Sequence, residues 1–368
     1  MKKFFGYLFI LAMVAFLVGL FGYSKSPAAE PQKPKELVYA TYMTFGYVNC
    51  ILDRWWMDEV EARSKGRVKF SKKFFDATLL KGNEVGTGIG LGQAHLGMAG
   101  LSNQPSVFPL TGAFNGVCYV ASKPDVQMNA LQALFKTEAA FVEELKRNKL
   151  HLLHNWGTVA TILATKKPVA RLEDLKGLRV RYYGGVGKAL ELLGATPVTI
   201  SYPEIYDALS KGVIDGLSGS PFELAFLNKL HEPAPYFLDP GIGSYGALTT
   251  IMNLDTWNSL PKDIQEIMSQ VSKELSFPYV STTMESEEKA LRGALRDGIK
   301  MGKLSPQEFD RWRNTAQKKY LEFEIDKLNK LGFPGDALFK RYISLANDYE
   351  KVSTYKNVFA VYEEKYKK

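Results

Sequence analysis

The sequence predicts an α/β protein with two lobes, each built on an open sheet and joined to the other by a hinge. The chain has 368 residues, of which 46% are hydrophobic, and this is enough to bury more than one core. Short apolar stretches alternate with helical patterns over residues 175–217, which favours open α/β sheets over a sandwich or a bundle. Residues from 263 onward are mostly helical, so we expect long C-terminal helices that span both lobes.

The first residues have the features of an export signal. Two lysines precede an apolar run over residues 4–21, and small residues follow as far as Ala29. We therefore expect residues 1–29 to be a signal peptide and residues 30–36 to be a linker, so that the protein works in the periplasm. An uncleaved membrane anchor is the alternative, because the apolar run is close to the length that spans a bilayer.

The first lobe is expected to contain residues 37–157 and 247–284. Glycine stands at every second position over residues 86–92. Each glycine weakens a helix by about 1 kcal/mol relative to alanine, so irregular or closely packed backbone is expected there. Strands are predicted at residues 37–44, 68–75, 92–100 and on both sides of Gly157, and helices at residues 48–63 and 129–149.

The second lobe is expected to contain residues 158–246 and 285–368, including the C-terminal helices. A β-α-β pattern indicates a sheet with parallel strands in this part of the chain. Its strands are predicted at residues 178–182, 196–201 and 213–217, and its helices at residues 187–193 and 203–210. Residues 246–253 form an apolar strand pattern that would return the chain to the first lobe.

Cysteine content and charge exclude some classes of protein. Cys50 and Cys118 are too few to frame a fold of this size; one bridge or two unpaired buried thiols are the alternatives. The net charge is +8, yet Lys and Arg are spread along the chain, and export argues against nucleic acid as a partner. The surplus charge is explained by a soluble surface or by attraction of an anion.

The residues that an enzyme would need form no recognisable pattern. The four histidines show no H-E-x-x-H spacing, and His151 and His154 have no carboxylate near them in the sequence. We therefore expect structural histidines, no metal and no cofactor. The acidic pairs Glu143–Glu144 and Glu287–Glu288 lie on helical patterns and are expected to be solvated. Residues 216–220 fall one residue short of G-x-S-x-G, so no catalytic activity is expected.

Several linked motifs have the order and spacing of a known family. They are D-L-K-G-L-R-V-R at residues 174–181, L-G-A-T-P-V-T-I-S-Y-P-E-I-Y-D-A-L at 193–209, G-V-I-D-G at 212–216 and N-x-x-x-W-x-x-L-P at 253–261. Through these motifs, and over roughly residues 36–335, the chain resembles the DctP-type solute-binding proteins of tripartite ATP-independent periplasmic (TRAP) transporters. The resemblance implies a two-lobed periplasmic binding protein fold, type II-like, with the ligand between the lobes.

The same resemblance implies that Arg181 forms an ion pair with the carboxylate of the ligand. The chemistry fits independently, because a guanidinium donates two parallel N–H bonds to a carboxylate and stays charged. Glycines and tyrosines follow Arg181, at a position where a crevice of an α/β sheet is expected. A surface arginine paired with a nearby acidic side chain is the structural alternative.

Further ligand-binding residues are expected in the second lobe on this resemblance. Tyr202 matches an aromatic residue that packs against the ligand, and Gly219 stands where the family usually has asparagine. Ser218 and Ser220 are candidates to replace the missing amide, and Phe222 is a candidate apolar wall, with ordinary loop structure as the alternative. The remaining expected residues of this lobe are Thr161 and Tyr183.

In the first lobe, the family places ligand-facing residues after the opening strand and after the strand at residues 92–100. Core or rim packing and helix capping are the structural alternatives for these positions. The expected residues are Tyr42, Phe45, Tyr47, Asn49, Ser102 and Asn103.

The expected function is capture of a small organic monocarboxylate for delivery to a TRAP membrane permease. Many dicarboxylate and sialic-acid binders of the family carry a second arginine where this chain reads N-W-G-T-V-A-T at residues 155–161, and no arginine lies between Gly157 and Thr165. The resemblance implies a monomer, since family members are mostly monomers. An exported sensor or adaptor of the same fold, which signals through a receptor, is the alternative.

Overall fold

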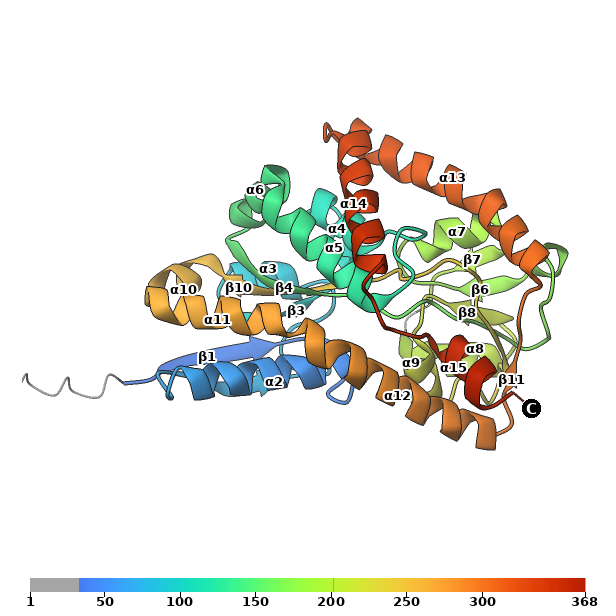
Figure 1. Ribbon diagram of the computed structural model, residues 1–368, viewed down its shortest axis with the longest axis horizontal. Coiled ribbons are helices and arrows are strands. Elements are labelled where there is room, and N and C mark those ends of the chain that lie inside the picture. Colours follow the sequence, from blue (N-terminus) through green and yellow to red (C-terminus); the bar gives the residue numbers. More distant parts are fainter. Residues whose placement is uncertain (1–32, 201, 368) are drawn as a thin grey trace, which may run out of the picture. The chain divides into compact units, whose positions relative to one another are not determined.

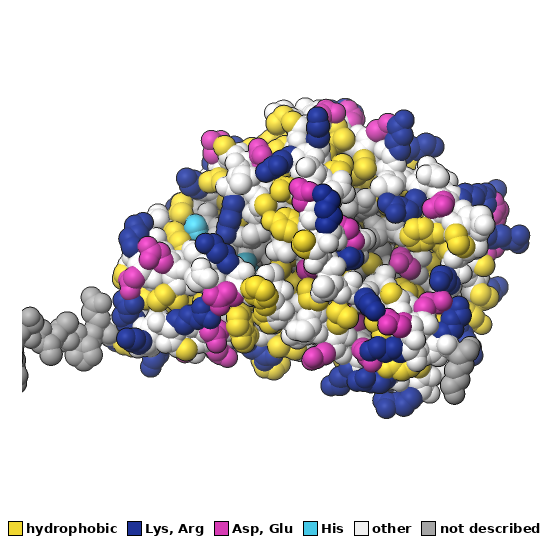
Figure 2. Space-filling model, in the orientation of Figure 1, with side chains coloured by type: hydrophobic (Ala, Val, Ile, Leu, Met, Phe, Trp, Pro, Cys, Tyr) yellow, Lys and Arg dark blue, Asp and Glu magenta, His cyan; other side chains and the backbone are white. Residues whose placement is uncertain are grey.

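The structure is a computed structural model, in which residues 33–200 and 202–367 are described (Figure 1). The expected signal peptide, residues 1–29, lies outside the described residues, as do residues 30–32 of the expected linker. No helix within the described part is long and apolar enough to cross a membrane. On the face shown in Figure 2, Lys and Arg side chains are interspersed with Asp and Glu over most of the surface.

Helices cover both faces of the first sheet. In the described chain its strand order is β2-β1-β3-β10-β4; β1 and β3 are parallel, and β10 is antiparallel to β3 and β4. One face packs on α2, α11 and α12, and the other on α3, α4, α5 and α6. The strands are β1 (Lys35–Ala40), β2 (Val68–Phe74), β3 (Leu96–Ala99), β4 (Leu150–Trp156) and β10 (Leu248–Asn253). The helices are α2 (Val48–Arg63), α3 (Val85–Gly90), α4 (Pro109–Asn115), α5 (Pro124–Thr137), α6 (Ala139–Arg147), α10 (Leu254–Ser259), α11 (Lys262–Glu274) and α12 (Ser276–Arg296).

The second sheet has the strand order β11-β9-β5-β8-β6-β7 in the described chain. Strand β6 is parallel to both β7 and β8, so the carboxyl ends of these three strands meet at one edge. The strands are β5 (Leu163–Thr165), β6 (Arg179–Arg181), β7 (Thr196–Val198), β8 (Gly216–Ser218), β9 (Tyr236–Leu238) and β11 (Lys300–Met301). The helices of this part are α7 (Val186–Leu192), α8 (Ile205–Ser210) and α9 (Phe222–Leu227). Short 3-10 helices lie at Leu101–Asn103, Leu172–Leu175 and Tyr202–Glu204.

The long C-terminal helices connect the two cores. Helix α12 contacts α2, which packs on the first sheet, and α9, which packs on the second. Helix α13 (Pro306–Lys330) packs on α7. Helix α14 (Gly335–Glu350) packs on α5, because Leu338, Phe339 and Tyr342 bury their side chains in the core on that face of the first sheet. This part of residues 285–368 therefore packs with the first lobe, although the sequence pattern assigned it to the second. Helix α15 (Val358–Lys365) contacts α12.

The glycine-rich segment is a short helix and not irregular backbone. Helix α3 contains Gly86, Gly88 and Gly90, and a Cβ atom on any of them would lie closer than 3.0 Å to a neighbouring atom. A Cβ atom on Gly90 would lie 2.3 Å from the backbone oxygen of Asn148, for example. The close packing was expected correctly, and the tertiary contacts that it permits outweigh the low helix propensity of glycine.

Two glutamates that were expected to be solvated are buried. Glu144 accepts hydrogen bonds from the backbone N–H groups of Leu110 and Thr111, both at 2.8 Å, and so satisfies the free end of α4. Glu287 is buried on α12, where the hydroxyl of Tyr355 donates a hydrogen bond to it. The expectation was wrong because the partners of both carboxylates come from distant parts of the sequence.

Candidate functional site

The two sheets present predicted site residues at the ends of their strands. Strand β6 ends at Arg181 and its parallel neighbour β8 ends at Ser218, so the turns that follow them carry Tyr183 and Gly219 side by side. In the first sheet, Tyr42 follows β1, and Ser102 and Asn103 follow the parallel strand β3. The carboxyl ends of parallel strands are where open α/β sheets bind ligands.

Arg181 is a buried guanidinium that is anchored by backbone oxygens alone. Its side chain is 5% exposed; Nε donates to the oxygen of Ile200 at 3.2 Å, and Nη1 donates to the oxygen of Gly219 at 3.4 Å. The guanidinium carbon lies 5.3 Å from the centre of the Tyr202 ring. No Asp or Glu of the described chain pairs with Arg181, and its Nη2 has no hydrogen-bond partner there.

The surroundings of Arg181 favour an anion. Burial lowers the pKa of Arg181, while Tyr245, Tyr202 and Tyr183 act in the opposite direction. An arginine remains cationic at any working pH in spite of such a shift. A buried cation without a counter-ion is costly, and an incoming carboxylate would supply both the missing charge and the missing acceptors.

Tyr183 connects the second sheet to the first. Its hydroxyl donates to Oδ1 of Asn103 at 2.9 Å and lies 3.4 Å from Oγ of Ser102. Nδ2 of Asn103 in turn donates to the hydroxyl of Tyr42 at 3.4 Å. Four of the predicted residues, from both lobes, are therefore brought together in one chain of polar contacts.

The predicted serines and Thr161 shape the turn after β8. Gly219 has a φ of +69°, and a Cβ atom there would lie 2.6 Å from the backbone nitrogen of Tyr183, so the asparagine usual in the family would not fit this backbone. Thr161 accepts from the N–H of Gly219 at 2.6 Å, and its hydroxyl lies 3.2 Å from that of Ser218. Both side chains are fully buried and position the oxygen that holds Arg181.

Tyr202 and Ser220 lie on the other side of this turn. Their hydroxyl oxygens are 3.2 Å apart, and Oγ of Ser220 also donates to the oxygen of Pro221 at 3.2 Å. Burial raises the pKa of Tyr202 to about 12, so its hydroxyl stays protonated at neutral pH. The ring of Tyr202 is the aromatic surface beside the guanidinium.

Three predicted residues have other surroundings. Phe45 is 52% exposed and its ring lies 3.7 Å from the guanidinium of Arg54, so it belongs to a surface contact. Phe222 is buried in the core under the second sheet, 5.2 Å from the ring of Phe237. Asn49 does not cap α2, whose first flanking residue is Tyr47; instead its Nδ2 donates to the oxygen of Gly157 at 3.4 Å.

Tyr245 is a candidate site residue that sequence reasoning missed. It precedes β10 in the segment G-S-Y-G, and its ring makes an edge contact with Tyr183, with 6.4 Å between the ring centres. Its backbone N–H donates to the hydroxyl of Thr158 at 3.3 Å. A tyrosine in a glycine-rich segment at the crossing from one lobe to the other was the available signal.

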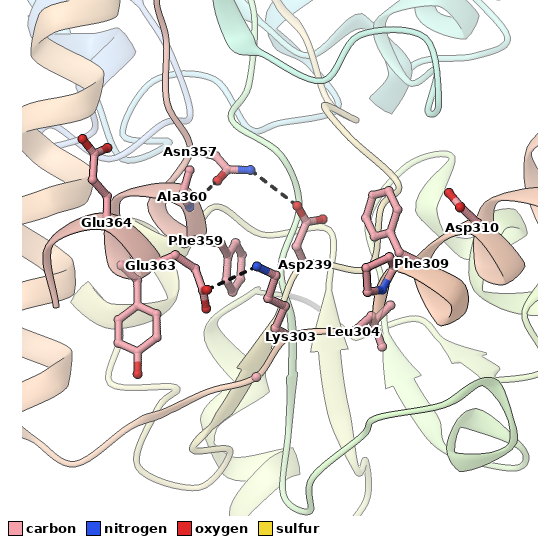
Figure 3. Close-up of a pocket in the computed structure, with 13 residues that line it drawn as sticks. Asp239, Lys303, Leu304, Phe309, Asp310, Asn357, Phe359, Ala360, Glu363 and Glu364 are labelled. Atoms are coloured by element: carbon pink, nitrogen blue, oxygen red, sulfur yellow. Dashed lines mark hydrogen bonds and ion pairs between the residues drawn. The ribbon is translucent and has the colours of Figure 1, made fainter. Parts of the chain in front are cut away.

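A separate pocket of about 630 Å³ lies beside β11 and α15 (Figure 3). Asp239 lies between Phe359 and Phe309 in this view, and Nδ2 of Asn357 donates to its carboxylate at 3.4 Å. Lys303, the one lysine lining the pocket, pairs with Glu363 at 3.2 Å. None of the predicted ligand-binding residues lines this pocket, and its cation already has a partner.

The chain matches a family profile over most of its length. The profile is that of the bacterial extracellular solute-binding proteins, family 7 (DctP), and it matches residues 53–326. The chain belongs to this family. It is a TRAP-type solute-binding protein, and the recognition made from its motifs is confirmed.

Solved structures confirm the two-lobed α/β fold of this solute-binding protein. A TRAP periplasmic solute-binding protein from Desulfovibrio salexigens is similar with a TM-score of 0.77 and 28% identity, over 87% of this chain and 98% of that one. A TRAP solute-binding protein from Rhodoferax ferrireducens, in complex with copurified benzoate, has a TM-score of 0.76 and 23% identity, over 86% and 99% of the two chains.

A sequence relative adds a further comparison. The monocarboxylate 2-oxoacid-binding periplasmic protein of Nostoc sp. is 31% identical over 178 residues, which are 48% of this chain and 46% of that protein. The matches to this protein and to two other curated relatives span 46–50% of the relatives' lengths.

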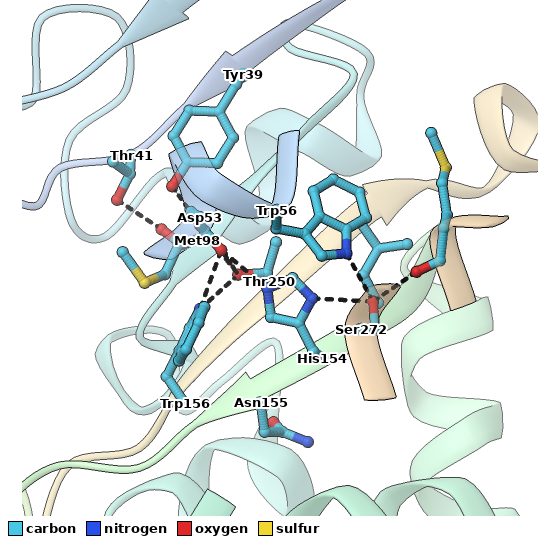
Figure 4. A network of polar contacts seen from close by, with 12 residues as sticks. Tyr39, Thr41, Asp53, Trp56, Met98, His154, Asn155, Trp156, Thr250 and Ser272 are labelled. Atoms are coloured by element: carbon cyan, nitrogen blue, oxygen red, sulfur yellow. Dashed lines mark hydrogen bonds and ion pairs between the residues drawn. The ribbon is translucent and has the colours of Figure 1, made fainter. Parts of the chain in front are cut away.

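The histidines and cysteines of the TRAP-type protein have structural surroundings. His154 lies on β4, with Nε2 at 2.8 Å from Oδ1 of Asp53 and Nδ1 at 3.2 Å from Oγ of Ser272 (Figure 4). The carboxylate that the sequence around His154 lacks is thus supplied by α2. His151 stacks on Trp257 with 3.8 Å between the ring centres, and burial lowers its pKa to about 4. Both cysteines are unpaired and buried, which raises the pKa of each thiol.

Proposed function

We propose that this solute-binding protein captures a small organic monocarboxylate between its lobes and delivers it to a TRAP membrane permease. One observation carries the proposal: Arg181 is a buried cation, anchored by two backbone oxygens, without an acidic partner in the described chain. The ligand carboxylate would accept hydrogen bonds from the free donors of the guanidinium, in the bidentate geometry that arginine favours.

The surroundings of Arg181 support one carboxylate and not two. Within the described chain, the groups that oppose the burial effect on the pKa of Arg181 are the tyrosines Tyr245, Tyr202 and Tyr183. The sequence between Gly157 and Thr165 supplies no arginine either. The benzoate complex and the 2-oxoacid-binding relative are named for monocarboxylates, whereas the similar DctP protein of Rhodobacter capsulatus is named for C4-dicarboxylates, so the choice rests on the residues of this chain.

Closure of the lobes over the ligand requires contacts from both sides. A ligand shifts a two-state protein toward the closed form only if it binds that form more tightly. Arg181 and Tyr202 would supply contacts from the second lobe, and Tyr42 and Asn103 from the first. The hydrogen bond between Tyr183 and Asn103 already joins the two sides.

Arg179 offers a matched control for testing Arg181. Both lie on β6, but Arg179 is exposed and pairs with Asp215 at 2.9 Å. Titration calorimetry with a panel of aliphatic and aromatic mono- and dicarboxylates would first identify a ligand. We expect Arg181→Ala to weaken its binding at least about 100-fold, as is typical for loss of a charge-assisted pair. Arg179→Ala should leave affinity unchanged.

Two outcomes would contradict the proposal. If Arg181→Ala bound the ligand within a few-fold of wild type, the carboxylate would bind elsewhere. If dicarboxylates bound much more tightly than the matching monocarboxylates, the substrate class would be wrong even with Arg181 correctly assigned. Circular dichroism of both variants would establish that the fold is retained.

A further inference from the structure

We propose that the pocket beside β11 and α15 is a second ligand site, which binds a small alkylammonium cation (Figure 3). Its volume of about 630 Å³ lies within the range of about 300–1,000 Å³ that small-molecule sites occupy. Neither Arg181 nor any other candidate residue for carboxylate binding lines this pocket. The inference therefore goes beyond capture of the carboxylate and does not depend on it.

A carboxylate stands between two aromatic rings in this pocket. Asp239 follows the end of β9, and in Figure 3 it lies between Phe359 of α15 and Phe309 of α13. Phe309 packs against the core that contains Trp312, and Phe359 against the core that contains Val361, so both rings are held in place. The face of an aromatic ring attracts a cation within about 6 Å, and a carboxylate pairs with it directly.

The carboxylate of Asp239 is oriented by neutral donors alone. Its Oδ1 accepts a hydrogen bond from the N–H of Gly241 at 2.8 Å, and its Oδ2 accepts from Nδ2 of Asn357 at 3.4 Å. Asn357 is itself fixed, because its Oδ1 accepts from the N–H of Ala360 at 2.8 Å and caps α15. No ion pair joins Asp239 to a Lys or Arg of the described chain. A carboxylate has about four lone-pair sites, so acceptor capacity and charge are left for a ligand.

The other charged side chains that line the pocket leave a negative balance. Lys303 pairs with Glu363 at 3.2 Å. Glu364 pairs with Lys356 at 2.7 Å. Asp310 also lines the pocket, is exposed and pairs with no cation of the described chain. The charges without a counter-ion are therefore both negative, although the protein as a whole carries a net charge of +8, and they favour a cation over an anion.

Burial raises the pKa of Asp239, and the positive charge of Arg313 acts against this effect. Arg313 lines a neighbouring pocket of about 300 Å³, in which Asp239, Phe309 and Asn357 also take part. Its Nη2 donates to Oε1 of Gln317 at 3.4 Å, and its guanidinium makes no ion pair with Asp239 among the described residues. A cation in direct contact with Asp239 would therefore offset the cost of burying its carboxylate.

An organic cation suits this pocket better than a metal ion. In the part of the chain that the structure describes, no group of three or more His, Cys, Asp or Glu side chains could hold a metal. An alkylammonium ion needs only one carboxylate, because its C–H groups pack on aromatic faces while its charge interacts with the rings. Asp239 and the rings of Phe309 and Phe359 supply both kinds of contact.

Matched pairs of a cation and an uncharged analogue test the inference. Suitable pairs are choline with 3,3-dimethylbutanol and butylammonium with butanol, each titrated calorimetrically into the full chain. We expect at least one cation to bind about tenfold or more tightly than its uncharged analogue. Asp239→Asn, which keeps the shape of the side chain, should abolish that preference. Phe359→Leu leaves the hydrogen bonds of Asp239 in place and should weaken binding of the cation several-fold, so it provides the test if Asp239→Asn does not fold.

Two control variants locate the cation. Glu364→Gln removes a carboxylate of the same pocket that already pairs with Lys356, and it should change the affinity for the cation by less than about threefold. Arg181→Ala should bind the cation as wild type does. If Arg181→Ala abolished cation binding, the cation would bind between the lobes and the second site would be wrong.

Two further outcomes would overturn the inference. One is equal binding of the cation and the alcohol in both pairs. The other is an unchanged preference in Asp239→Asn or, where that variant does not fold, in Phe359→Leu. Binding of carboxylates by Asp239→Asn should match wild type, so failure of the second site is distinguishable from failure of the proposed function.

Discussion

Asp53 and Arg181 are both buried charged side chains, 1% and 5% exposed, but their surroundings are opposite. The carboxylate of Asp53 lies within 3.2 Å of the hydroxyl of Tyr39, the indole N–H of Trp156, the hydroxyl of Thr250 and a ring nitrogen of His154 (Figure 4). Within the described residues, Arg181 donates to only two oxygens, both of the backbone. Burial of a charged side chain therefore does not by itself indicate a binding site. A buried charged group that keeps hydrogen-bonding atoms without partners does indicate one.

The comparison implies that the two charges serve different purposes. The network at Asp53 joins β1, α2, β4 and β10, so it fixes the first sheet against its helix. The cation at Arg181 makes the second sheet no more stable than an apolar side chain would, because its charge is unpaired. The first is expected to act on stability and the second on binding.

Asp53→Asn should have the largest effect on stability. The amide NH₂ group would face the donors that now converge on the carboxylate, leaving buried groups without acceptors. We expect the free energy of unfolding to fall by about 3 kcal/mol or more, measured by urea denaturation. Ligand affinity at a temperature where the variant is folded should stay close to that of wild type.

Asp58 provides the control for that change, since it lies on the same helix and its side chain is 71% exposed. Asp58→Asn should change stability by less than about 0.5 kcal/mol. If both variants lost the same free energy of unfolding, the hydrogen bonds to Asp53 would not be the source of its contribution to stability.

Glu287 and Glu288 extend the comparison to a smaller, pH-dependent effect. Burial raises the pKa of Glu287 from 4.5 to about 8, so the folded protein keeps a proton that the unfolded chain releases above pH 4.5. The contribution of Glu287 to the free energy of unfolding is therefore at its full value below pH 4.5. Between pH 4.5 and pH 8 the free energy of unfolding falls by up to about 1.4 kcal/mol per pH unit. Glu287→Gln should flatten this part of the profile.

The neighbouring residue again supplies a control. Glu288 pairs with Lys365 at 2.8 Å, and hydrogen bonding to Lys365 lowers its pKa. Glu288→Gln should leave the decline between pH 5 and pH 8 as it is in wild type. Urea denaturation of the three proteins at intervals of one pH unit makes the comparison, and parallel profiles for all three would contradict the assignment to Glu287.

The placement of Arg181 could be predicted because it depends on local pattern. A short strand that ends at arginine, followed by glycines and a helix, fixes the end of β6 without knowledge of the rest of the chain. The parallel neighbour β8 then brings Gly219 to the same edge. The recognition of the family rested on the linked motifs of this region, and the structure places them at the same edge.

Other features could not be predicted because distant residues determine them. The expected helix at residues 129–149 is two helices, separated at Glu138, whose ψ of 115° is extended although no Pro or Gly stands there. The amphipathic pattern of α14 does not indicate which core receives Phe339 and Tyr342. Tyr245 was missed for the same reason, since its relevance comes from the approach of Tyr183 and Arg181.

The central claim, that Arg181 awaits a ligand carboxylate, is tested most directly by the stability of Arg181→Met with and without ligand. Without ligand, we expect its free energy of unfolding to be within about 1 kcal/mol of wild type, because removal of an unpaired buried charge offsets the two lost hydrogen bonds. A ligand identified calorimetrically should stabilise wild type and not the variant. A loss of 3 kcal/mol or more without ligand, together with an unchanged ligand effect, would contradict the account and make Arg181 a structural residue like Asp53.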